Sequence, residues 1–184
     1  GRDPDGITLL AVSKRIDTAR IEAALATGAR ALGESRVQEA DAKIPEIEGD
    51  AEWHFIGPLQ SNKAALAARL FDAIHSVRTT SLVPRLSASA TAADRNVQVY
   101  VQIERSPERL SEAQVAEVAT ICRQAYEAAG LELRGLMTMA PYAADPEASR
   151  PYFATLRRLR DDITASYPEL APLGLSMGMS GDFE

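Results

Sequence analysis

The chain has 184 residues, of which 46% are hydrophobic, and it carries a formal net charge of -6. This length supports one well-filled core, so we expect a single domain over residues 1–184. Because an acidic protein repels polyanions, the charge argues against nucleic acid as a partner. Any ligand that bears a phosphate must therefore be held by a local site.

The sequence predicts a cytoplasmic protein that does not enter a membrane. Its single cysteine, Cys122, cannot form an internal disulfide bond. No stretch approaches the roughly 20 apolar residues that a membrane-spanning helix needs. The first six residues contain no apolar signal core, so we expect no export.

The first structural unit is a strand followed by a helix. Leu9–Val12 is a short apolar run bounded by polar residues, which predicts a buried strand. Residues 18–27 have a helical pattern, with Asp17 or Thr18 as the N-cap and Gly28 just past the end.

The same alternation continues along the chain. Further strands are predicted over residues 31–34, 53–56, 73–77, 97–101, 133–139 and 173–179. Helices are predicted to begin near Ser35, Ser61, Thr80, Ser111 and Asp145. The pairs Ser35 with Gln38 and Ser111 with Gln114 have the spacing of capping boxes.

Strict alternation of strands and helices predicts an α/β fold with a parallel sheet and helices outside it. Seven repeats fit a TIM (β/α)8 barrel or a doubly wound open sheet, and we favour the barrel. Its usual length exceeds roughly 200 residues. We therefore expect a C-terminally incomplete barrel that lacks its last helix and strand in this chain.

Lys14 is the leading candidate for chemistry. It is one of three lysines, with Lys43 and Lys63, and it alone directly follows a predicted buried strand. Ligand sites of parallel barrels lie at the C-terminal ends of the strands. An apolar barrel mouth favours the neutral amine, which is the form that attacks an aldehyde to give a Schiff base. The alternative is a solvated lysine in a loop.

A segment of small residues predicts a phosphate cradle near the end of the last strand. Small side chains there let backbone N–H groups approach an anion. The candidate residues are Ser176, Gly178, Met179 and Ser180. The alternative is an ordinary surface loop.

Three further residues are candidates for contact with a ligand. His54 lies inside a strand and can face a ligand ring, although a hydrogen-bonded core histidine is the alternative. Met137 can contact an aromatic ring, with core packing as the alternative. Ser35 follows a strand, and a role as N-cap is its alternative. We interpret His75 as structural.

Five sequence blocks together resemble one known family. They are LLAVSK (9–14), GESRVQEA (33–40), WHFIGPLQSNK (53–63), RGLMTM (134–139) and LSMGMS (175–180). In this order they resemble the pyridoxal phosphate homeostasis protein family, also called the YggS family. The resemblance implies a barrel similar to the N-terminal domain of alanine racemase, with pyridoxal 5'-phosphate bound to Lys14.

The chain departs from the family pattern in two places. Ser35 stands where the family usually has an asparagine, which affects a contact to the cofactor ring. The family's final strand carries an arginine that faces the pyridine nitrogen and a glycine-threonine pair near the phosphate, and no segment here matches it. We therefore expect only part of the family's site and weak cofactor binding.

The resemblance implies a carrier that buffers pyridoxal phosphate and passes it to apo-enzymes without turnover. We expect a monomer rather than an oligomer. A racemase needs a second base from an additional domain, for which this chain has no room. The alternative is a Schiff-base lysine barrel enzyme, racemase-like or aldolase-like, acting on an amino acid or a phosphorylated carbonyl substrate. That enzyme needs an acid or base near Lys14, for which Glu34 and Asp182 are the candidates. A non-catalytic interaction protein is a third possibility.

Overall fold

The computed structural model describes residues 3, 6–103, 108 and 110–182. Seven parallel strands form one sheet in chain order. The strands are β1 (Ala11–Val12), β2 (Ala31–Glu34), β3 (Glu52–Phe55), β4 (Ala73–Val77), β5 (Val97–Gln102), β6 (Leu131–Met137) and β7 (Gly174–Ser176).

Helices connect successive strands. The α-helices are α1 (Thr18–Ala26), α2 (Val37–Lys43), α3 (Ala64–Leu70), α4 (Leu82–Ala92), α5 (Glu112–Glu127) and α6 (Arg150–Ser166). Short 3-10 helices are η2 (Ile44–Glu46), η3 (Ser61–Lys63), η4 (Pro146–Ser149) and η5 (Pro168–Leu170). None of the helices in the described part of the chain is long and apolar enough to cross a membrane.

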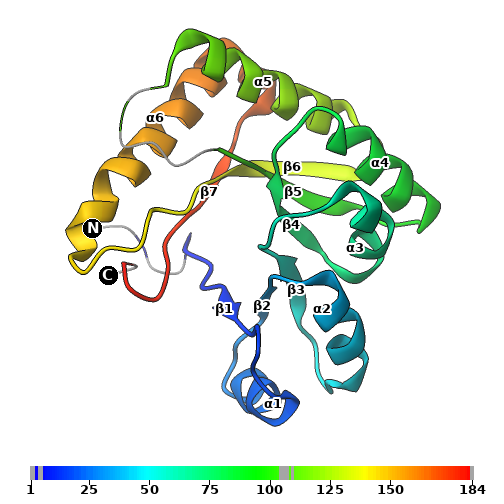
Figure 1. Ribbon diagram of the computed structural model, residues 1–184. Coiled ribbons are helices and arrows are strands. Elements are labelled where there is room, and N and C mark those ends of the chain that lie inside the picture. Colours follow the sequence, from blue (N-terminus) through cyan, green and yellow to red (C-terminus); the bar gives the residue numbers. More distant parts are fainter. Residues whose placement is uncertain (1–2, 4–5, 104–107, 109, 183–184) are drawn as a thin grey trace.

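The sheet curves into an incomplete ring with the helices on its outside, and the ring is open between β1 and β7 (Figure 1). Neighbouring strands follow one another in sequence, as expected for strand–helix–strand units with short connections. This arrangement confirms the predicted parallel barrel-type fold. It also leaves β1 and β7 as the two edges of the sheet.

The outer face of the sheet packs against the helices. Val97, Val99 and Val101 of β5 have no exposed surface, whereas Gln98 and Tyr100 between them are half-buried. Because side chains of a strand alternate between faces, the valines face the helix layer and the polar residues face the interior of the ring. The core therefore lies between sheet and helices, and β5 presents Gln98 and Tyr100 to the interior.

Register assigns the other strands to the same two faces. His54 pairs with Gly33 on one side and with Ala73 on the other, and Ala73 pairs with Gln98 of the interior face. Phe55, one residue later, contacts Phe71 with 5.1 Å between the ring centroids. His54 therefore faces the interior of the ring, and Phe55 faces the helices.

Several predicted helix starts are confirmed. The Asp17 side chain accepts a hydrogen bond from the backbone N–H of Arg20 at the start of α1. Ser111 and Gln114 form the predicted capping box of α5. Asp145 accepts from the backbone N–H of Glu147, although a 3-10 helix precedes α6 there.

The prediction of a buried first strand is wrong. Strand β1 contains two residues, and Leu9 lies outside it with 79% of its surface exposed. Val12 is 46% exposed. The physical reason is that β1 is an edge strand. It has a neighbouring strand on one side only, so its apolar side chains are left partly uncovered on the other side.

Two predictions near the strand ends are also wrong. The α2 N-cap is Arg36, without a side-chain capping bond, so Ser35 and Gln38 do not form a capping box. Strand β7 ends at Ser176, so Met179 lies in the following turn rather than in a strand. Gly178 has a φ of 94°, which does not fit a strand and ends the extended run.

Candidate functional site

Lys14 follows β1 in a tight turn at the carboxyl end of the sheet. The turn is closed by a hydrogen bond from the backbone N–H of Ile16 to the carbonyl of Ser13, at 3.0 Å. Arg15 has a positive φ of 61° in this turn. Lys14 is exposed, and its side chain has no hydrogen-bond or ion-pair partner among the residues that the structure describes.

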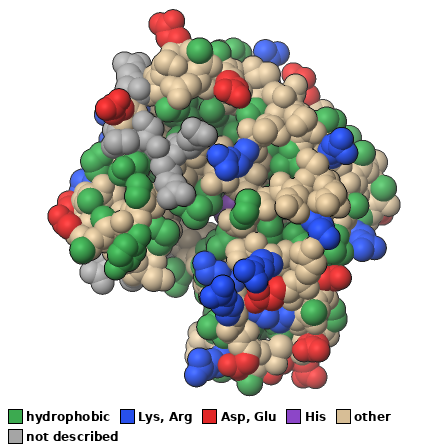
Figure 2. Space-filling model, in the orientation of Figure 1, with side chains coloured by type: hydrophobic (Ala, Val, Ile, Leu, Met, Phe, Trp, Pro, Cys, Tyr) green, Lys and Arg blue, Asp and Glu red, His purple; other side chains and the backbone are tan. Residues whose placement is uncertain are grey.

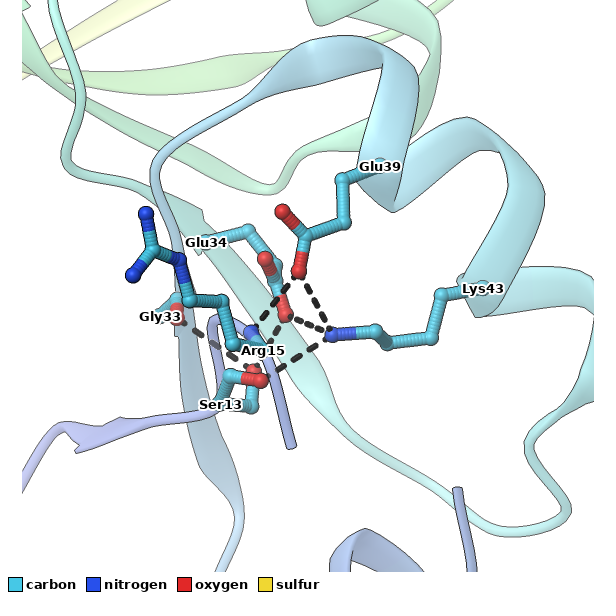
Figure 3. A network of polar contacts seen from close by, with 6 residues as sticks. All are labelled: Ser13, Arg15, Gly33, Glu34, Glu39 and Lys43. Atoms are coloured by element: carbon cyan, nitrogen blue, oxygen red, sulfur yellow. Dashed lines mark hydrogen bonds and ion pairs between the residues drawn. The ribbon is translucent and has the colours of Figure 1, made fainter. Parts of the chain in front are cut away.

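A polar network lies beneath this turn (Figure 3). The Lys43 ammonium contacts Oε1 of Glu34 at 2.9 Å and the carbonyl oxygen of Ser13 at 3.0 Å. The Ser13 hydroxyl donates to the same Glu34 oxygen at 2.8 Å. Glu34 is fully buried, and these two partners satisfy its Oε1 atom.

Glu39 extends the network to the far side of the turn. Its Oε1 accepts a hydrogen bond from the backbone N–H of Arg15 at 2.8 Å and lies 3.3 Å from the Lys43 ammonium. The Arg15 N–H, and then Lys43, lower the pKa of the Glu39 carboxyl. Residue 13 is thus tied to β2 and α2, and residue 15 to α2, which fixes the backbone on either side of Lys14.

Neither acidic candidate is free to act beside Lys14. Glu34 is engaged by Lys43 and Ser13, and its side chain faces the helix layer. Asp182 accepts hydrogen bonds from the Ser149 hydroxyl, at 3.0 Å, and from the backbone N–H of Met179. Both carboxylates hold local structure together.

A chain of hydrogen bonds crosses the interior of the ring. Nδ1 of His54 lies 2.8 Å from Nε2 of His75, and Nδ1 of His75 lies 2.7 Å from the Ser176 hydroxyl. These residues come from β3, β4 and β7, so the chain joins strands on opposite sides of the ring. The ring of Tyr100 stacks on His75 with a centroid distance of 4.3 Å.

Burial lowers the pKa of both histidines, which favours their neutral forms. Burial, and then the neighbouring His54, lowers the pKa of His75 to about 3. Burial also lowers the pKa of His54, against the opposing effects of Glu52 and Asp72. A neutral imidazole donates through one nitrogen and accepts through the other, which suits a continuous chain. The space-filling view shows a histidine in the depth of a hollow (Figure 2).

The predicted phosphate segment lies beyond β7. Ser176 pairs in register with Met137, which is buried. Gly178 has a positive φ, and Met179 and Asp182 close a turn through a hydrogen bond between their backbones, at 3.0 Å. Ser180 is exposed in this turn.

The structure brings only some of the eight predicted site residues together. His54, Ser176 and Met137 share the interior face, joined through His75. Ser35 instead lines a cavity beside α2 and η3. Among the described residues, no hydrogen bond or ion pair joins Lys14 to the other seven.

Sequence reasoning missed the residues that hold Lys14 in place. Glu39 and Lys43 are four residues apart, a spacing that puts both on one helix face. Glu34 ends an otherwise apolar strand, where a buried carboxylate requires a cationic partner. Taken together, these two signals are enough to indicate the Glu34–Lys43 pair from the sequence.

Comparison with known proteins identifies the fold. A family model described as "Alanine racemase, N-terminal domain" matches residues 6–184. An alanine racemase from Clostridium difficile superposes with a TM-score of 0.76 over 95% of this chain and 47% of its own. Its sequence identity of 12% supports the fold alone. The class is therefore the alanine racemase N-terminal barrel.

Relatives of higher identity define the family within that class. A "Pyridoxal phosphate homeostasis protein" from Vibrio alginolyticus is 37% identical over 191 residues, covering 99% of this chain and 80% of that relative. PipY from Synechococcus elongatus, solved with pyridoxal phosphate bound, is 36% identical with a TM-score of 0.85. That match covers 96% of this chain and 84% of PipY. The chain belongs to the pyridoxal phosphate homeostasis protein family.

Proposed function

We propose that this protein binds pyridoxal phosphate reversibly through Lys14 and carries or buffers it without catalytic turnover. The relatives' name assigns those proteins to pyridoxal phosphate homeostasis, and PipY has been solved with the cofactor bound. The bound cofactor supplies a reactive aldehyde. Lys14 would hold the cofactor through a reversible bond between its amine and that aldehyde, formed with loss of water and broken by hydrolysis.

The contrast between Lys14 and Lys43 carries this proposal. The Lys43 ammonium donates hydrogen bonds to Glu34, Glu39 and the Ser13 carbonyl, and these bonds occupy its N–H groups. A charged amine is not a nucleophile. The Lys14 side chain has no such contact within the described residues, and its backbone is held on both sides.

The interior face fits an aromatic phosphate ligand. Val12, two residues before Lys14, pairs with Gly33 of the interior, so the turn that carries the exposed Lys14 begins at the rim of the ring. His54 and His75 are neutral there and hold the Ser176 hydroxyl at the start of the small-residue segment. The positive φ of Gly178 turns that segment back, and the backbone N–H of Met179 within it is bonded to the Asp182 carboxylate, which a phosphate would have to replace.

The engaged carboxylates support a carrier rather than an enzyme. Catalysis with this cofactor needs an acid or base that reaches the reacting atoms. Glu34 and Asp182 both serve local structure, as described above. No observation favours the racemase-like or aldolase-like alternative.

The proposal is tested by titrating the protein with pyridoxal phosphate and recording the imine absorption band. We expect the band for the wild-type chain and for the control Lys63→Ala, and its loss for Lys14→Ala. The loaded wild-type protein should not racemise alanine. A band that persists in Lys14→Ala, or turnover that requires Lys14, would overturn the proposal.

We further propose that the carrier acts as a cytoplasmic monomer that gives its cofactor to apo-enzymes. The absence of a disulfide pair and the acidic composition support this setting. An apo-form of a pyridoxal phosphate enzyme mixed with loaded protein should regain activity faster than the cofactor's release into buffer allows. Recovery no faster than that release would contradict delivery.

A further inference from the structure

A cavity of about 390 Å³ lies where the loops after β2 and β3 meet. It is lined by Ser35, Arg36, Val37, Gln38, Phe55, Pro58, Gln60 and Lys63. Its size falls within the range of small-molecule sites, which is roughly 300–1,000 Å³. Four of its residues belong to the 53–63 block that marks the family resemblance, and the cofactor site does not use these four.

This cavity is separate from the proposed Lys14 site. Phe55 lines it and faces the helix layer, where it packs against Phe71. His54 faces the opposite side of the same strand, toward the interior of the ring. Lys14 does not line the cavity, and Ser35 is its only residue shared with the predicted cofactor site.

The cavity is positively charged at its rim and apolar at its floor. Val37 and Phe55 are buried, while Arg36 is exposed and Lys63 is half-buried. Neither cation forms an ion pair within the described part of the chain. Gln38 and Gln60 add exposed amide groups that donate hydrogen bonds.

Glu39 interacts electrostatically with Arg36, and Lys43 offsets that carboxylate, whereas Lys63 forms no ion pair within the described residues. Glu34 and Glu39 are the carboxylates of the adjoining network, and Lys43 pairs with both. Figure 2 shows Lys and Arg side chains gathered over β1 and β2 with an acidic side chain among them, on a molecule whose net charge is -6. The rim of this cavity therefore attracts anions, although the protein as a whole repels them.

We propose that this cavity is a second, non-covalent site for the phosphate monoester of a small ring-bearing molecule. Arg36 and Lys63 bind the phosphate, for which the forked guanidinium and the compact ammonium are both suited. The ring lies on Val37, Phe55 and Pro58, and the glutamine amides complete the hydrogen bonds. This site does not depend on Lys14.

Calorimetric titration with phenyl phosphate, which has no aldehyde, tests the site. We expect binding to the wild-type chain and to Lys14→Ala, and at least tenfold weaker binding to Arg36→Gln/Lys63→Gln. The control Arg85→Gln/Arg157→Gln removes the same charge from the exposed sides of α4 and α6 and should bind as wild type. Added salt should weaken the binding because both cations are solvent-accessible.

Three outcomes would overturn the inference. They are no binding to wild type up to roughly 10 mM, unchanged binding to Arg36→Gln/Lys63→Gln, and inorganic phosphate that binds as tightly as phenyl phosphate. Circular dichroism checks that the variants fold, and Lys63→Arg, which keeps the cation, should retain binding. Because Lys14→Ala leaves this site intact, failure of the proposed carrier function would appear separately, as a missing imine band.

Discussion

The ammonium of Lys43 lies 2.9 Å from a carboxylate oxygen of Glu34, whose side chain has no exposed surface. The Lys43→Met variant removes the cation and leaves the buried Glu34 charge without its partner. We expect a loss of about 3–5 kcal/mol in the free energy of unfolding, the range typical of broken buried pairs. Urea denaturation measures it.

Lys63→Met is the matched control for that change. Lys63 is half-buried and forms no ion pair within the described residues, so we expect its unfolding free energy to stay within about 0.5 kcal/mol of wild type. Equal losses for Lys43→Met and Lys63→Met would contradict the structural role assigned to the Glu34–Lys43 pair.

Stability should depend on pH through His75. Its pKa is about 3 in the folded protein, against about 6.5 in the unfolded chain. Between these two pH values the unfolded chain binds a proton that the folded protein does not. The free energy of unfolding is therefore highest above about pH 6.5, and it falls as the pH is lowered. We expect about 2 kcal/mol less stability at about pH 5 than at about pH 7 from this group.

The comparison variant is His75→Asn. It removes the titrating group, so its loss of stability between the two pH values should be smaller than that of wild type. The carboxylates contribute equally to both proteins and cancel in this difference. An identical pH dependence in wild type and His75→Asn would show that His75 titrates as an ordinary exposed histidine.

Gly57 is needed because the chain passes close to Ser35. A Cβ atom at position 57 would lie 2.0 Å from the backbone oxygen of Ser35. Gly57→Ala must push the ends of β2 and β3 apart, and we expect a loss of at least about 2–3 kcal/mol. Gly6→Ala, where nothing lies within 4 Å of the added atom, should be neutral. Thermal unfolding of both variants decides between these expectations.

Much of the fold could be predicted because it follows from local patterns. The alternating valines of β5 and the capping box at Ser111 are set by neighbouring residues, and both occur as expected. The exposure of β1 could not be predicted in this way. It depends on which strand lies beside it, and Leu9 and Val12 read as core residues in sequence.

The candidate site was predictable only in part for a related reason. Strand-end position pointed to Lys14 and to the segment after β7. The chain from His54 through His75 to Ser176 links residues up to 122 positions apart, counted as 176 minus 54, and no spacing rule reveals such a contact. The sequence predicts a structural role for His75. Its two hydrogen bonds link His54 of β3 to Ser176 of β7, across the ring.

Ser35→Asn should strengthen cofactor binding. Ser35 stands at the position where the resemblance places an asparagine, whose longer amide adds hydrogen-bonding groups near the ends of β2 and β3. One added hydrogen bond is worth about 1 kcal/mol, or roughly fivefold in affinity. The imine band, titrated with pyridoxal phosphate, gives the affinity. Ser35→Ala should not show the gain, and an unchanged affinity for Ser35→Asn would remove this position from the cofactor site.

The central claim is that Lys14 alone forms the covalent link to pyridoxal phosphate. Borohydride reduction of the loaded protein fixes the link, and peptide mass spectrometry locates it among Lys14, Lys43 and Lys63. Our account predicts a modification at Lys14 and none at Lys43, whose amine is held by Glu34 and Glu39. A reduced adduct on Lys43 or Lys63 with Lys14 unmodified would contradict it.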